Sequence, residues 1–174
     1  MNTRHIAAVA ALGSLAFAGP AVAAPKANTI TAIGGMKVKF NAYVQDDQRW
    51  DANVYSVKSG ARVTLRDKST EGQPHTLSLI KKLPKTPAQI MGCQACGPLN
   101  AGHEVDMMSG NVGKPLIEAG AAGFDTAGDK DAAGDSIYVP AKGKVTFKVT
   151  AKKGSTLAFV CALHPWMLGE IKVK

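Results

Sequence analysis

The amino-acid sequence predicts an all-β protein, a Greek-key β-sandwich or barrel of seven or eight strands with one long insertion. Apolar and polar residues alternate in short runs within residues 29–79 and again within residues 136–174. Alternation with a period of two is typical of strands that bury one face. Gly, Pro and Ser residues separate these runs and favour turns between strands. Many short strands with such turn signals are typical of sandwiches and barrels, and this pattern alone would also fit an immunoglobulin-like module.

The first 23 residues are typical of a secretory signal peptide. Arg4 precedes an apolar run at residues 6–18 that is too short for a membrane-spanning helix, and Gly19-Pro20 ends it. Ala21-Val22-Ala23 is a small-x-small cleavage signal. We therefore expect residues 24–174 to form the mature protein, exported to the periplasm or secreted, without a membrane span.

Two groups of strands form the predicted framework. In the first group, alternation predicts that Met36, Val38 and Phe40 face the core, and likewise Ala61, Val63 and Leu65. Residues 70–74 supply a turn before a further strand that begins at His75. The second group comprises four short runs, at residues 137–139, 144–149, 156–161 and 170–173.

An insertion at residues 81–134 separates the two groups. Prolines at 84, 87, 98 and 115 interrupt it, and residues 118–134 are rich in Gly, Ala and Asp. We expect an excursion with one or two short helical turns, one of them around Pro87 to Met91. Because domains of 100 to 150 residues are common, we expect residues 24–174 to form a single domain that includes this insertion.

A soft-donor motif lies near the C-terminus. Cys161, His164 and Met167 place a thiol, an imidazole and a thioether within seven residues. Two imidazoles and a thiolate with a weak axial thioether suit copper that cycles between Cu(I) and Cu(II). Strand parity nominates His75 as the second imidazole, because His75 shares a face with Leu77 and Leu79, while Cys161 shares a face with the apolar residues 157 and 159.

With these four residues, the chain resembles the cupredoxins, the blue (type 1) copper proteins. The spacing Cys-x2-His-x2-Met, with Pro165 after the histidine, is closest to the short-loop amicyanin-like and plastocyanin-like members. The resemblance implies one copper ion per chain, held by His75, Cys161, His164 and Met167. It also implies that His164 lies at the surface within an apolar patch, to which Leu163, Pro165 and Trp166 contribute.

The remaining cysteines are Cys93 and Cys96. In an oxidising compartment three cysteines allow one disulfide, and a Cys93–Cys96 bond leaves Cys161 as the free thiol. One alternative stays open beside this one: a second copper site built from Cys93, Cys96 and His103 with Met91, Met107 and Met108. Two others fail. Cys93, Cys96, Cys161 and His164 have the spacing of zinc ligands but lie too far apart in sequence for a compact module, and Asp129, Asp131, Gly134 and Asp135 do not match a calcium loop.

The charge pattern and the number of histidines restrict the classes of function that this protein can have. The net charge is +8, but the lysines alternate singly with strand residues. This pattern favours a solvated, positively charged face and argues against a nucleic-acid-binding surface. Such a face would attract an acidic redox partner. Beyond His5 of the signal peptide only three histidines remain, too few for a type 1 site and a catalytic copper cluster. We expect a monomeric one-electron carrier rather than an enzyme, with a cytochrome or a copper or quinone dehydrogenase or oxidase as partner. The alternatives are a copper transport or storage protein and a metal-free adhesion-like sandwich.

Overall fold

The computed structural model describes residues 27–106, 108–109, 112–117, 121–125 and 135–174. The expected signal peptide and its cleavage site lie outside the described residues, as do Met107 and the Asp129, Asp131 and Gly134 of the acidic loop.

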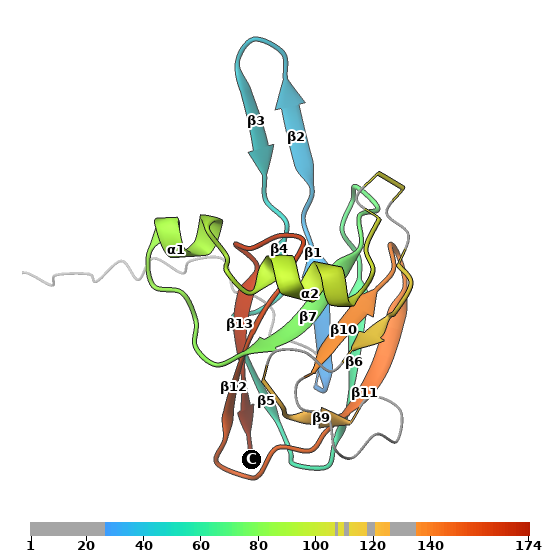
Figure 1. The fold of residues 1–174 in the computed structure, drawn as a ribbon, viewed down its shortest axis with the longest axis vertical. Coiled ribbons are helices and arrows are strands. Elements are labelled where there is room, and N and C mark those ends of the chain that lie inside the picture. Colours follow the sequence, from blue (N-terminus) through green and yellow to red (C-terminus); the bar gives the residue numbers. More distant parts are fainter. Residues whose placement is uncertain (1–26, 107, 110–111, 118–120, 126–134) are drawn as a thin grey trace, which may run out of the picture.

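Two β-sheets face each other across one hydrophobic core (Figure 1). The first sheet has the order β4 (Arg49–Trp50), β1 (Thr29–Ile33), β6 (Arg62–Asp67), β11 (Lys144–Val149) and β9 (Phe124–Asp125). The second has the order β5 (Val54–Val57), β13 (Leu168–Val173), β12 (Thr156–Val160), β7 (His75–Ile80), β10 (Ser136–Val139) and β8 (Leu116–Ile117). Apart from the consecutive pair β12–β13, most neighbouring strands come from distant parts of the sequence, and the pairs β1–β6 and β13–β5 are parallel.

The predicted strands and their parity are confirmed for the sandwich. Strands β6, β7, β10, β11, β12 and β13 lie where alternation predicts them, to within two residues. Val63 and Leu65 face Leu77, Leu79 and the other apolar side chains of the second sheet inside the core. The two sheets thereby bury the apolar faces that neither could bury alone.

The prediction for Met36, Val38 and Phe40 is wrong. Strand β2 (Met36–Lys39) pairs only with β3 (Tyr43–Asp46), and this hairpin projects beyond both sheets (Figure 1). Val38 is 54% exposed and Phe40 is 90% exposed. Alternation of apolar and polar residues predicts that a strand has an apolar face. It does not predict whether another sheet covers that face, because this depends on where the strand lies in the fold.

Replacing Phe40 with Ser tests this correction. Because Phe40 is 90% exposed, we expect the free energy of unfolding to change by no more than about 0.5 kcal/mol. Phe147, which is 1% exposed, provides the control, since Phe147→Ala should cost about 3 to 5 kcal/mol. Denaturant unfolding measures both. A loss above about 2 kcal/mol for Phe40→Ser would mean that the hairpin is packed against the body of the protein.

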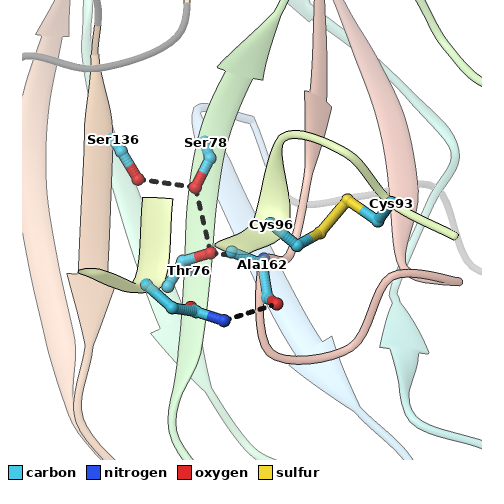
Figure 2. The surroundings of a disulfide bond; sticks show 7 residues. Thr76, Ser78, Cys93, Cys96, Ser136 and Ala162 are labelled. Atoms are coloured by element: carbon cyan, nitrogen blue, oxygen red, sulfur yellow. Dashed lines mark hydrogen bonds between the residues drawn. A yellow bond between two sulfur atoms is a disulfide. The ribbon is translucent and has the colours of Figure 1, made fainter. Parts of the chain in front are cut away.

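The helical part of the insertion packs on the outer face of the second sheet. Helix α1 (Pro87–Met91) is the predicted one; Thr86 caps it by accepting a hydrogen bond from the Gln89 amide, with Pro87 in its first turn. The expectation of one or two helical turns named no residues for a second one, which is α2 (Cys96–Gly102); its buried Cys96 and Leu99 pack with Val160 and Ala162. Cys93 and Cys96 form a disulfide between the two helices (Figure 2).

Candidate metal centre

His75, Cys161 and His164 lie together at one end of the sandwich core. One ligand atom from each of the three lies within 4.8 Å of the others, and all three residues are buried. The Cys161 Sγ atom is 3.8 Å from His75 Nδ1 and 3.5 Å from His164 Nδ1. Two imidazole nitrogens therefore converge on one sulfur, a donor set suited to a soft metal ion.

Backbone hydrogen bonds hold the loop that carries Cys161, His164 and Met167. The Cys161 amide donates to the Met167 carbonyl over 3.0 Å, and the Met167 amide donates to the His164 carbonyl over 2.8 Å. Met167 is 1% exposed and belongs to the same core cluster as Cys161. The loop returns directly into β13, where Gly169 pairs with Phe159; a Cβ atom at Gly169 would come within 2.4 Å of the Phe159 ring.

Cys161 follows the last residue of β12 and is completely buried. Burial raises the pKa of its thiol, while the backbone amides of Thr76, Leu163 and His164 act to lower it. The Thr76 amide donates to the Cys161 sulfur over 3.3 Å. In the absence of a metal the thiol is protonated, and a bound cation would favour the thiolate that these amides stabilise.

Asp67 lies behind the His75 ring in the core. The His75 Nε2 atom lies 3.5 Å from Asp67 Oδ1, and both side chains are fully buried. Burial and, to a smaller extent, the neighbouring His164 lower the pKa of His75 to about 4, against the opposing effect of Asp67 and Asp46. Asp67 is itself fixed by the amides of Ser69 and Lys142. The neutral ring can therefore present Nδ1 to a metal.

His164 is covered rather than exposed, which corrects the expectation of a surface ligand. It is 6% exposed. Its Nε2 atom lies 2.9 Å from Gln73 Oε1 and 3.3 Å from Gln48 Nε2, and Trp166 packs edge-on against its ring. When Nε2 carries the proton it donates to the Gln73 oxygen, and Nδ1 is then free to bind a metal. Burial lowers the pKa of His164.

The expected apolar patch is only partly at the surface. Trp166 is 39% exposed, and its Nε1–H donates to the Gln48 carbonyl over 3.1 Å. Leu163 and Pro165 are partly buried. Of these three residues, Trp166 therefore presents the exposed surface beside His164.

A polar network on the opposite face of β7 was not predicted. The Ala162 amide donates to Thr76 Oγ1 over 2.7 Å, Ser78 donates to the same oxygen over 3.0 Å, and Ser78 Oγ lies 2.5 Å from Ser136 Oγ (Figure 2). His103 Nε2 is 2.7 Å from Ser136 Oγ. In the sequence, the one indication of this network was that Thr76 and Ser78 lie on the polar face of a strand. The network is buried only because the insertion covers that face.

His103 gives a pH-dependent prediction. It is fully buried, its Nδ1 lies 2.6 Å from the Lys114 carbonyl, and burial lowers its pKa from the usual 6.5. The unfolded chain then binds the proton more readily, so this contribution to stability is present above about pH 6.5 and is lost as the pH falls toward the lower pKa of the folded state. We expect His103→Gln to cost about 1 to 3 kcal/mol near pH 7.5 and clearly less near pH 5.

Urea unfolding of the copper-free wild type and variant at the two pH values measures this difference. Other buried histidines titrate in both proteins and cancel in the comparison. The His103 ring lies near Tyr138, and Lys114, whose carbonyl is beside His103, forms an ion pair with Glu104. Tyr138, Lys114 and Glu104 are kept in the variant so that the two proteins differ only at His103. A cost that does not depend on pH would show that His103 contributes only through packing.

The structure offers little support for a second metal site within the insertion. Both nitrogens of His103 lie within hydrogen-bonding distance of oxygen atoms, and Cys93 and Cys96 are bonded to each other. The same disulfide removes two ligands from the zinc alternative. Met91 and Met108 are 69% and 96% exposed. Among the described residues, the one group of three or more His, Cys, Asp or Glu side chains whose ligand atoms converge is His75, Cys161 and His164.

Comparison with known proteins finds similarity only among solved structures. No protein-family model matches the chain, and no curated protein matches it. A purple cupredoxin from Nitrosopumilus maritimus is 15% identical with a TM-score of 0.42, covering 86% of this chain and 100% of its own. An amicyanin mutant is 14% identical with a TM-score of 0.40, covering 88% and 90%. Auracyanin from the photosynthetic bacterium Roseiflexus castenholzii is 17% identical with a TM-score of 0.40, covering 86% and 99%.

These solved structures are cupredoxins. In this chain's own structure, two β-sheets enclose the group formed by His75, Cys161 and His164, with Met167 on the same loop, and these donors suit copper. Over the described residues, no helix combines the length and the apolar character needed to cross a membrane.

Proposed function

We propose that this protein is a type 1 copper protein that carries single electrons between redox partners. The observation that carries the proposal is the convergence of His75 Nδ1, Cys161 Sγ and His164 Nδ1 within 4.8 Å in a buried setting. Met167 would supply the fourth, weak ligand. One copper ion per chain, alternating between Cu(I) and Cu(II), would supply the redox chemistry.

The surroundings of the ligands support electron transfer. Gln73 lies within hydrogen-bonding distance of His164, Asp67 lies 3.5 Å behind His75, and hydrogen bonds of its own backbone close the loop. Ligands fixed in this way move little when the charge of a bound ion changes, and a small rearrangement is what rapid one-electron exchange requires. Substrate-activating chemistry would need further open ligands, and we propose a carrier rather than an enzyme.

We further propose that the carrier is exported and monomeric, and that it exchanges electrons with a cytochrome or with a copper or quinone dehydrogenase or oxidase. The signal-like residues 1–23 support export. The net charge of +8 favours an acidic partner surface. Trp166, the exposed neighbour of His164, supplies an edge at which a partner could approach the ligand.

The visible spectrum and metal content of the purified protein test the proposal. We expect one copper per chain, an intense visible absorption after oxidation that disappears on reduction, and reversible electrochemistry. Binding of several Cu(I) ions without a coloured oxidised form would overturn the proposal in favour of copper transport or storage. Absence of any visible band after copper addition would favour the metal-free sandwich.

Met167→Gln tests the fourth ligand. We expect the variant to keep its copper but to have a lower reduction potential, because an amide oxygen is a harder donor than a thioether and favours Cu(II). Cyclic voltammetry measures the potential. Met91→Gln, at an exposed position of α1, is the control and should leave the potential unchanged. An unchanged potential in Met167→Gln would remove Met167 from the ligand set.

A further inference from the structure

A groove of about 790 Å³ lies beside the ligand loop, between the start of the insertion and the second sheet. Apolar residues from four segments line it: Ile80 at the end of β7, Leu83 and Ile90 from the segment that contains α1, Val160 at the end of β12, and Pro165 of the ligand loop. This volume lies in the range of pockets that hold small organic molecules. The groove is separate from the candidate metal centre, since none of His75, Cys161, His164 and Met167 lines it.

The polar part of the groove is positively charged. Lys81, Lys82 and Lys85 line it, and no Asp or Glu is among its lining residues. All three lysines are exposed, and none takes part in an ion pair within the part of the chain that the structure describes. Uncompensated ammonium groups beside apolar surface favour a ligand that combines an apolar body with a negative charge.

The fold also forms the groove in advance of any ligand. The Cys93–Cys96 disulfide joins the segment after α1 to α2, and Cys96 packs in a cluster with Val160. Asn100 of α2 donates to the Ala162 carbonyl over 3.1 Å, which ties the insertion to the ligand loop. A ligand that enters a groove fixed in this way loses little of its binding energy to ordering of the protein.

We propose that this groove is a binding site for an amphipathic organic anion, such as an aromatic carboxylate or sulfonate. The proposal goes beyond electron transfer and does not require copper. Pro165 directly follows His164 and Val160 directly precedes Cys161, so a bound anion would contact both ends of the segment that holds two of the candidate ligands. An acidic segment of a partner protein is the competing occupant, and the experiment below separates the two.

Titration with naphthalene-2-sulfonate, followed by amide chemical shifts in two-dimensional NMR, tests the site in the copper-free and the Cu(I)-loaded protein. We expect saturable binding with a dissociation constant of about 1 mM or tighter. The shifted signals should map to residues 80–95, Val160 and Pro165. The neutral analogue 2-naphthalenemethanol should bind about tenfold more weakly or worse, because it lacks the charge.

Two variants test the groove itself. The triple change Lys81→Gln, Lys82→Gln and Lys85→Gln should weaken binding of the sulfonate about tenfold. The matched control is Lys58→Gln, Lys152→Gln and Lys153→Gln, which removes the same charge from loops at the opposite end of β12 and should change the affinity less than about twofold. Ala88→Trp, which places a large ring in the groove from α1, should prevent binding without loss of the folded NMR spectrum.

Three results would overturn the proposal. The first is equal affinity for the sulfonate and the alcohol, which would mean nonspecific apolar contact. The second is a set of shifts on the β2–β3 hairpin or scattered over the surface. The third is no saturable binding, which would leave the acidic segment of a partner protein as the occupant. Since copper content is measured separately, failure of the type 1 copper proposal would leave these outcomes unchanged.

Discussion

Cys161→Ser is expected to abolish the visible absorption of the oxidised protein and to weaken copper binding by more than about 100-fold, because loss of a second-shell partner alone costs 10- to 100-fold. The sulfur is the point on which both imidazole Nδ1 atoms converge. A serine oxygen is similar in shape but is a hard donor and is not readily deprotonated, so it replaces neither the softness nor the charge of the thiolate. Absorption spectroscopy with competitive copper titration measures both effects.

The other cysteines provide the control for this variant. The double change Cys93→Ser and Cys96→Ser removes a disulfide in the insertion, and we expect the colour and the single copper to remain. A Cys161→Ser protein that keeps the visible band would exclude Cys161 as a ligand. Loss of the copper in the double variant would instead connect the insertion to metal binding.

Asp67→Ala is expected to produce the second large effect, through a residue that does not itself contact the metal position. Asp67 is 2% exposed and accepts hydrogen bonds from the Ser69 and Lys142 amides, while its Oδ1 lies 3.5 Å from His75 Nε2. Removal of the carboxylate leaves two backbone donors without their partner and frees the His75 ring to turn. We expect a loss of about 3 kcal/mol in the free energy of unfolding and a 10- to 100-fold loss of copper affinity.

Two further variants separate these contributions. Asp67→Asn keeps the shape and one acceptor oxygen, so its effect on stability should be smaller, while the loss of charge behind His75 should still weaken copper binding. Asp106→Ala changes an exposed aspartate in the insertion and should leave both properties within error. Denaturant unfolding of the copper-free proteins and copper titration give the two values. Unchanged copper affinity in Asp67→Ala would show that packing alone orients His75.

The grouping of the candidate ligands could be predicted because it depends on short-range rules of strand parity and loop spacing. Parity along β7 and β12 turns His75 and Cys161 toward the core whatever the strands pair with, and a three-residue spacing keeps His164 and Met167 near Cys161. The helix at Pro87–Met91 also follows from local signals, the Thr86 cap and the proline in its first turn.

The second layer around the ligands could not be predicted in this way. Gln48 and Gln73 lie 116 and 91 residues away from His164 in the sequence, and neither belongs to a recognisable motif. Asp67 ends an ordinary alternating strand. Such contacts arise from the pairing and packing of distant segments, which a single sequence does not display.

The sequence by itself determined the strands of the sandwich and the grouping of His75 with Cys161 and His164, because periodicity and spacing are properties of the chain at short range. Only the tertiary structure decided that the Met36–Phe40 run projects into solvent, that His164 is covered, and that the insertion joins the ligand loop to form a cationic groove. Burial and charge at these places depend on which distant segments lie alongside, and that is fixed only when the two sheets and the insertion pack together.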